Sequence, residues 1–143
     1  MFIIGVGTAV PATRYSQRQC HEAIADSPQY GKLERRSRAL LRRLLLGENG
    51  IRTRALALDP IADAFDAHPD VLHRRFLEHA PRLAQQAAEA ALRDAGCAAL
   101  DIDGLIISTC TGYLCPGLTS YVIERLGLSS DVIALDLVGQ GCG

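Results

Sequence analysis

The pattern of apolar positions along the chain predicts strands that alternate with helices. Residues 103–109, with the apolar run Leu105-Ile106-Ile107 at their centre, predict a strand covered on both faces, and residues 131–138 predict another buried strand. A third run, Phe2–Val6, ends at Gly7 and predicts another short buried strand. Residues 51–58 are expected to be extended as well.

Helices are predicted at 33–46, 70–95 and 118–126, and a glycine directly follows each of them. In the longest segment, apolar residues recur at three- and four-residue spacing and form one stripe that can face a core. Pro81 lies inside this segment, and we expect it to kink the helix or to mark a restart.

A further helix near the start of the chain is predicted by a capping box. Ser16 is followed three residues later by Gln19, so that each side chain can bond to the other residue's backbone N–H. We expect the helix to begin there, to run to about Ala25 and to be broken by Ser27-Pro28.

The order of these elements predicts the α/β fold class, layered with a mainly parallel sheet. No internal repeat, low-complexity tract or shift of composition divides the chain. Residues 1–143 are therefore interpreted as one domain.

Composition and charge exclude several classes of function. The formal net charge is −1, so the field of the whole chain favours neither a nucleic acid nor a membrane surface as partner. The apolar stretches are too short to span a membrane, and the start lacks the pattern of a secretory signal. With five cysteines and no such signal, we expect reduced thiols and a cytoplasmic location.

The last segment carries the candidate catalytic chemistry. A predicted strand leads into residues 139–143, Gly-Gln-Gly-Cys-Gly, where three glycines surround Cys142. Glycines permit a sharp turn and the close approach of another molecule to the backbone. A helix beginning just after Cys142 would favour the thiolate, which is the nucleophilic form of the side chain. The spacing alone fits a catalytic nucleophile and a buried structural cysteine equally.

Three segments resemble the type III polyketide synthase (chalcone synthase-like) family. Residues 135–143, Leu-Asp-Leu-Val-Gly-Gln-Gly-Cys-Gly, are similar to that family's nucleophile strand and turn. Residues 108–117, Ser-Thr-Cys-Thr-Gly-Tyr-Leu-Cys-Pro-Gly, are similar to its loop after the preceding core strand, and Gly127-Leu128 continues the match. Residues 5–11 give a weaker match. Together the resemblance covers the whole chain in register and is typical of the bacterial branch.

This resemblance implies the N-terminal half of a thiolase-like fold, a chalcone/stilbene synthase N-terminal domain truncated just after the nucleophile. It implies that Cys142 takes an acyl group from an acyl-CoA. Malonyl-CoA then loses carbon dioxide, and the resulting enolate attacks the cysteine thioester. The coenzyme A thioesters are substrates, no resident cofactor or metal is implied, and the protein is expected to be a homodimer.

The resemblance also implies what this chain lacks. The family's His and Asn, which activate the thiol and stabilise the developing charge, lie far downstream of the cysteine. No histidine here matches their motifs, so we expect the 143 residues to be inactive alone.

Three further residues are candidates for substrate binding by the same resemblance. Cys110 and Thr111 would line the starter and cyclisation space, although a buried loop cysteine and a turn-capping threonine are the simpler interpretations. Cys115 stands where many family members carry a bulky residue that closes the partner's cavity, so a small side chain leaves room for a long acyl chain. Two thiols without a second pair do not make a zinc site.

The coenzyme A contact differs from the family pattern. Family members hold the phosphates with basic side chains on the second helix, but Leu41, Leu44 and Glu48 occupy the matching positions here. Arg42 and Arg43 stand beside them and can meet the same need for a cation near phosphate.

Two other interpretations stay open. The chain could belong to a ketoacyl synthase III-like condensing enzyme, which shares the fold. It could also be a non-catalytic truncated fragment with a structural or dimerising role.

Overall fold

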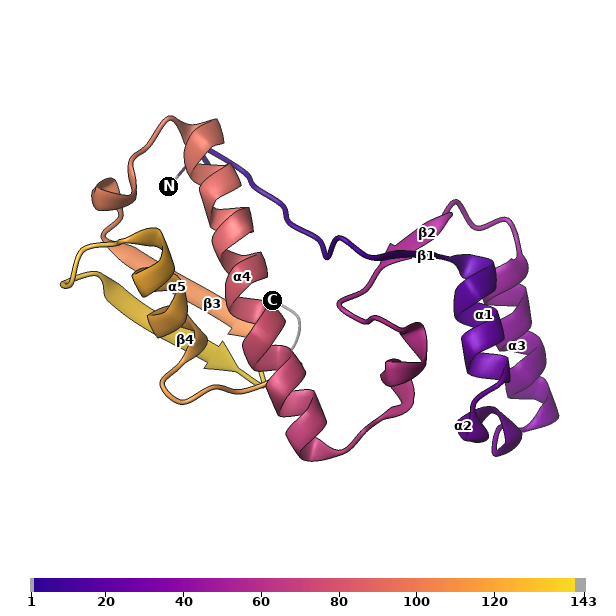
Figure 1. Ribbon diagram of the computed structural model, residues 1–143. Coiled ribbons are helices and arrows are strands. Elements are labelled where there is room, and N and C mark those ends of the chain that lie inside the picture. Colours follow the sequence, from indigo (N-terminus) through magenta and orange to yellow (C-terminus); the bar gives the residue numbers. More distant parts are fainter. Residues whose placement is uncertain (1, 141–143) are drawn as a thin grey trace. The chain divides into compact units, whose positions relative to one another are not determined.

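The computed structural model describes residues 2–140 of the 143-residue chain. The chain divides into two compact units, and each is described by itself. The helical unit is Val10–His68, and the sheet unit combines the start of the chain, up to Ala9, with the part from Pro69 onward. Figure 1 shows the elements of both units in sequence colours.

Three helices, a two-stranded antiparallel sheet and a 3-10 turn form the helical unit. The helices are α1 (Gln17–Ala25), α2 (Pro28–Gly31) and α3 (Arg35–Leu46). Strand β1 (Arg14–Ser16) pairs antiparallel with β2 (Thr53–Ala55). A 3-10 turn, η1 (Ile61–Phe65), follows β2.

The capping box at the start of α1 is confirmed. The Ser16 hydroxyl accepts from the backbone N–H of Gln19 at 3.1 Å, and the Gln19 side chain accepts from the Ser16 backbone N–H at 2.8 Å. Helix α1 packs on α3, where Cys20 and Leu45 are both buried. Only Thr53–Ala55 of the extended segment predicted at 51–58 forms a strand.

The sheet unit is built around one long helix and two parallel strands. Its elements are α4 (Pro69–Ala95), the 3-10 turn η2 (Ala99–Asp101), β3 (Gly104–Thr109), α5 (Leu118–Leu126) and β4 (Ile133–Val138). The strands predicted at 103–109 and 131–138 and the helices predicted at 70–95 and 118–126 are therefore present, with ends that differ by at most two residues from the prediction.

Helix α4 continues across Pro81. Of the two predicted outcomes, a kink or a restart, the restart does not occur. The proline ring is fully buried. Its burial against neighbouring side chains offsets the loss of one backbone hydrogen bond inside a long helix.

The buried core of the sheet unit lies where α5 meets α4 and the strands. Leu114, Leu118 and Val122 are 2%, 6% and 1% exposed. Partly buried side chains pack around them: Phe76, Ala80 and Ala84 from α4, Leu105 and Ile107 from β3, and Tyr121 and Leu126 from α5. Burial of these apolar surfaces holds the helices on the sheet.

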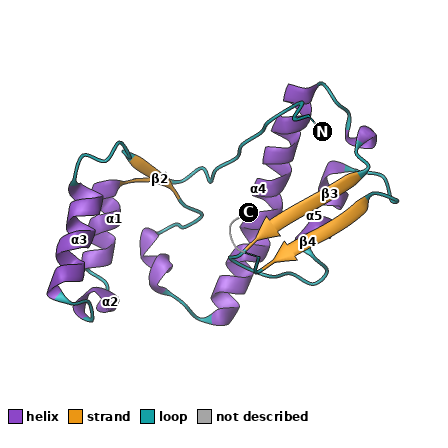
Figure 2. Cartoon of the chain, turned by 180° about the vertical axis from the view of Figure 1, so that it is seen from behind, coloured by secondary structure: helices purple, strands orange, loops and turns teal. Residues whose placement is uncertain are grey.

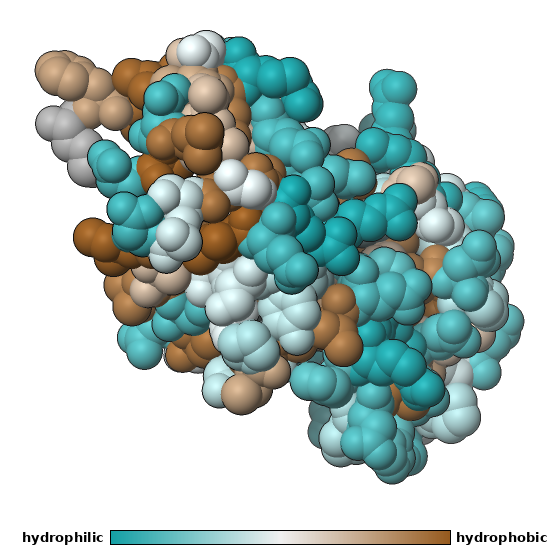
Figure 3. Space-filling view, turned by 60° about the vertical axis from the view of Figure 1, so that its left-hand side comes forward, coloured by the Kyte–Doolittle hydropathy of each residue, from teal (hydrophilic) through white to brown (hydrophobic). Residues whose placement is uncertain are grey.

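The prediction that both strands are buried is wrong for the described residues. Side chains of β3 alternate between exposed and half-buried, and Ile106 is 67% exposed. Its partner in β4, Leu135, is 48% exposed. Helix α5 packs on the face that carries Leu105 and Ile107, so the opposite face stays open within residues 2–140 (Figure 2). Figure 3 shows hydrophobic residues gathered on part of the visible surface.

The predicted strand at Phe2–Val6 is also wrong. These residues form no strand, and Phe2 and Ile3 are 90% and 84% exposed. The segment lies along α4 instead, where the Val6 backbone N–H donates to the Asp94 carboxylate at 2.9 Å. A β-carbon on Gly7 would meet the Ala87 carbonyl oxygen at 2.1 Å, so the chain approaches the helix more closely than other residues permit.

The α/β class is thus confirmed, whereas a mainly parallel layered sheet is not. The described residues contain one two-stranded parallel sheet, β3–β4, and one two-stranded antiparallel sheet, β1–β2. Parallel strands need a crossover, and α5 supplies it between β3 and β4.

Truncation of the core leucine Leu114 tests this packing. We expect Leu114→Ala to lower the free energy of unfolding of the sheet unit by about 2–5 kcal/mol, because it removes buried methyl groups and leaves a cavity. Leu100→Ala is the control, because Leu100 is 74% exposed. Urea unfolding followed by circular dichroism measures both, and equal effects of the two changes would contradict the assignment of the core.

Candidate active site

The carboxyl ends of β3 and β4 form one edge of the parallel sheet. Thr109, the last residue of β3, pairs with Val138, the last residue of β4. The Gly139 backbone N–H then donates to the Thr109 carbonyl at 3.0 Å, which extends the ladder by one bond. Ligands of open α/β sheets bind outside this edge, so the segments that leave it are the candidate site.

The candidate nucleophile itself lies outside the described residues, which end at Gln140. The strand predicted to lead to Cys142 is present as β4. Gly139 has φ 75°, so the backbone turns there in a conformation that favours glycine. The role of Cys142 stays a prediction.

The loop that follows β3 carries the three predicted substrate-binding residues. The structure places Cys110, Thr111 and Cys115 on this one loop, and all three are exposed. The Thr111 backbone N–H donates to the Thr109 hydroxyl at 3.4 Å. Leu114 points the other way, into the core. The loop therefore has a buried side, which holds it in place, and an exposed side, which carries the three candidate residues. Their roles in substrate binding stay predictions.

Asp136 was missed by the sequence analysis. It sits in β4, on the face that packs against α5, and its carboxylate accepts hydrogen bonds from the backbone N–H of Thr119, at 3.1 Å, and from the Thr119 hydroxyl. The signal was present in the sequence: Asp136 interrupts the apolar residues that follow Asp131 in the predicted strand 131–138. A charge in such a strand needs hydrogen-bonding partners, because burying it alone is costly.

The basic residues considered for coenzyme A lie on α3. Arg42 and Arg43 are exposed, and so is Leu44, whereas Leu41 is half-buried. Arg38 makes contacts within the helical unit: its guanidinium lies 5.5 Å from the centre of the Tyr30 ring and donates to the Leu33 carbonyl at 2.8 Å.

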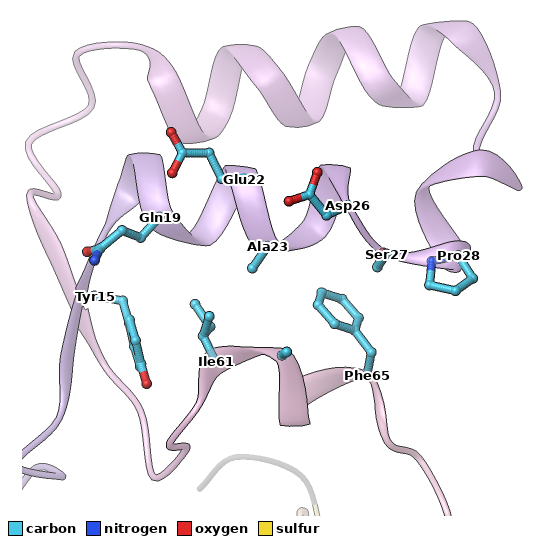
Figure 4. A pocket seen from close by; sticks show the side chains of 10 residues that line it. Tyr15, Gln19, Glu22, Ala23, Asp26, Ser27, Pro28, Ile61 and Phe65 are labelled. Atoms are coloured by element: carbon cyan, nitrogen blue, oxygen red, sulfur yellow. The ribbon is translucent and has the colours of Figure 1, made fainter.

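An open groove of about 520 Å³ lies in the helical unit, apart from all the predicted site residues. Figure 4 shows Ile61 and Phe65 pointing from η1 toward Ala23 of α1. At one end stands Tyr15, whose hydroxyl donates to the Leu58 carbonyl at 2.8 Å. Desolvation raises the pKa of Tyr15 above its ordinary value, and the nearby charges of Asp59 and Asp63 and the Cys20 thiol act in the same direction.

Residues 2–140 contain neither a metal-ligand cluster nor a membrane-spanning helix. No three residues among the His, Cys, Asp and Glu of this range come together as metal ligands do. No helix in the same range combines the length and apolarity needed to cross a bilayer.

The known proteins that are similar to the chain are synthases much longer than the chain itself. No family model matches it. It is 36% identical, over 98% of its length, to 1,3,6,8-tetrahydroxynaphthalene synthase of Streptomyces peucetius subsp. caesius. It is 32% identical, again over 98%, to 3,5-dihydroxyphenylacetyl-CoA synthase of Streptomyces toyocaensis. The chain spans 36% and 34% of these two relatives.

A solved structure agrees with these relatives. The crystal structure of PKS-I from the brown alga Ectocarpus siliculosus superposes with a TM-score of 0.80 at 25% identity. The match covers 98% of this chain and 40% of that one.

The raised pKa of Tyr15 predicts a loss of stability at high pH. The folded chain holds this proton more tightly than the unfolded chain, so the contribution of Tyr15 is complete below the ordinary pKa of 10.0 and is lost as the pH rises through the folded pKa. In a pH titration, the tyrosinate absorbance of the wild type minus that of Tyr15→Phe is expected to reach its midpoint at a pH above 10.0. Tyr113→Phe is the control for removing a hydroxyl from an exposed ring, and a midpoint for Tyr15 at or below 10.0 would refute the prediction.

Proposed function

We propose that the chain belongs to the type III polyketide synthase family, and that its parent protein condenses an acyl-CoA starter with malonyl-CoA through a thioester on Cys142. The proposal makes the parent protein an acyltransferase of polyketide biosynthesis. Its substrates are coenzyme A thioesters, and it needs no resident cofactor.

One structural observation supports this proposal above the others. The parallel register of β3 and β4 brings Thr109 beside Val138, so the loop 110–117 and the segment that leads to Cys142 leave the sheet at one edge. A nucleophile and the loop that shapes its substrate pocket need such proximity, since reacting groups must be held within a few ångströms.

The first step is acyl transfer to the cysteine. The Cys142 thiolate attacks the thioester carbonyl of the acyl-CoA, a new carbon–sulfur bond forms, and the bond to the coenzyme A sulfur breaks. The coenzyme A thiolate leaves and takes up a proton. The proton of the Cys142 thiol goes to a general base, for which the resemblance provides a histidine downstream of this chain.

The second step is condensation. Malonyl-CoA releases its terminal carboxylate as carbon dioxide, and the electron pair of that bond becomes the enolate of acetyl-CoA. The enolate carbon attacks the acyl group on Cys142, the carbon–sulfur bond breaks, and the cysteine thiolate is restored. The product is a β-ketoacyl-CoA that is two carbons longer, and it can be loaded again.

Partners and location follow from the same proposal. We propose a cytoplasmic homodimer, in which Cys115 of each protomer stands where a bulky side chain would close the neighbouring cavity. The exposed guanidinium groups of Arg42 and Arg43 can meet the phosphates of coenzyme A as charge-assisted donors.

Replacement of the nucleophile tests the proposal directly. In the full-length parent enzyme, Cys142→Ala is expected to abolish the covalent acyl adduct, because the acyl group has no thiolate to attach to. Intact-mass measurement after incubation with a panel of acyl-CoAs detects the adduct.

The matched control is Cys97→Ala, which removes a half-buried thiol that contacts the Ala95 carbonyl at 3.8 Å. This variant is expected to form the adduct as the wild type does. An acyl adduct that persists in Cys142→Ala would sink the proposed function.

The size of residue 115 gives a second test. We expect Cys115→Phe to lower kcat/KM for long acyl-CoA starters by at least about tenfold relative to short ones, because the ring occupies space that a long chain needs. Cys115→Ala keeps the side chain small and is the control. The products of both variants are identified by mass spectrometry. A uniform loss of kcat/KM for all starters would contradict a position of residue 115 in the acyl cavity.

A further inference from the structure

The start of α5 lacks its usual cap. The N-cap residue is Gly117, which has no side chain and makes no capping hydrogen bond. The first N–H groups of a helix have no partner within the helix and need an acceptor from elsewhere. Asp136 supplies that acceptor from β4, although it lies 17 positions further along the chain.

The contact between Asp136 and the start of α5 is close and largely shielded from water. Thr119 is 2% exposed, so its two hydrogen bonds to the carboxylate are made away from bulk solvent. A β-carbon on Gly117 would lie 2.0 Å from Oδ2 of Asp136, which means that only glycine leaves room for the carboxylate there. Hydrogen bonds to a charged acceptor are stronger than neutral ones, and the positive end of the helix favours the charge.

A second anchor holds the other end of the same loop. A β-carbon on Gly112 would lie 2.4 Å from the Phe76 ring of α4, so the loop backbone rests directly on that ring. Between the two anchors Leu114 is buried in the core. The loop 110–117 is therefore held at Gly112, Leu114 and Gly117, while Cys110, Thr111 and Cys115 are exposed.

We propose that Asp136 is a positioning residue for the acyl site: its bonds to Thr119 hold the loop 110–117 in place against β4, and so determine which acyl chains the site accepts. This inference rests on the proposed function. It goes beyond it by naming the residue that couples the candidate pocket loop to the strand that leads to Cys142.

The choice of a carboxylate supports a role beyond packing. An apolar residue at position 136 would suit the half-buried strand face without the cost of removing a charge from water. A carboxylate binds Thr119 in one geometry and therefore specifies the loop position as well as stabilising it. Displacements of about 1 Å near a reacting centre change rates by about a hundredfold, so a loop held in this way affects the choice of substrate.

The test uses the full-length parent enzyme and four variants. Asp136→Asn removes the charge and replaces one acceptor oxygen by a donor, and Thr119→Val removes the hydroxyl while keeping the shape. Thr119→Ser is the conservative variant that keeps the hydroxyl. Asp131→Asn is the matched control, because Asp131 is an exposed carboxylate of the same α5–β4 connection that bonds to Ser129.

Two measurements are made on each variant. Amide hydrogen exchange of residues 110–117 reports the position and mobility of the loop without any need for activity. The ratio of kcat/KM for long and short acyl-CoAs, together with Tm, separates selection of the acyl chain from plain loss of stability.

We expect Asp136→Asn and Thr119→Val to speed exchange in the loop by about tenfold, as local opening becomes easier, and to shift the chain-length ratio by at least about fivefold. For Thr119→Ser and Asp131→Asn, the exchange rate of the loop and the chain-length ratio should both stay within about twofold of the wild type. Unchanged loop exchange in the first two variants overturns the inference. Faster exchange or a lower Tm with an unchanged ratio also overturns it, because the contact is then only structural.

Failure of the proposed function has a different signature. A wild-type parent enzyme that forms no acyl adduct on Cys142 refutes the function, and the role of Asp136 in acyl selection falls with it. Loop exchange in the same samples still shows whether Asp136 anchors the loop.

Discussion

The parallel pairing of β3 and β4 is the constraint on which the rest of the sheet unit depends. Its register places Thr109 beside Val138, and a further bond from Gly139 to Thr109 continues the pairing past the end of β4. Parallel strands require a crossover, and α5 covers one face of the pair while it connects them. The loop that carries Cys110, Thr111 and Cys115 and the segment that begins at Gly139 therefore start from the same edge of the sheet.

The contact between Asp136 and Thr119 shows how that edge is kept in order. A helix that begins at glycine, a strand that carries a carboxylate and a threonine that is almost fully buried satisfy one another's polar groups. Within its own helix or strand, none of these three residues has the hydrogen-bonding partner or the space that it needs. In combination they tie the loop after β3 to β4, which is the strand that leads toward the candidate nucleophile.

The open apolar surfaces of the sheet unit have a common physical cause. Phe2–Val6 and the face that carries Ile106 and Leu135 have strand-like, apolar sequences, yet their large apolar side chains are exposed. Apolar runs of this kind are typical of strands buried on both sides in α/β proteins. The chain spans about a third of the length of the two curated relatives.

By itself the sequence determined the elements whose signals are local. The capping box at Ser16, the apolar stripe of α4 and the glycine after α5 each act within one or two turns of chain, so their helices could be predicted. The motifs at 108–117 and 135–143 likewise predicted the loop after β3 and carried the resemblance to the family. Tertiary structure alone decided which strands pair, which face α5 covers and that Asp136 caps a helix 17 positions away. These outcomes depend on contacts between distant residues, and the spacing of residues within one segment does not determine the energies of such contacts.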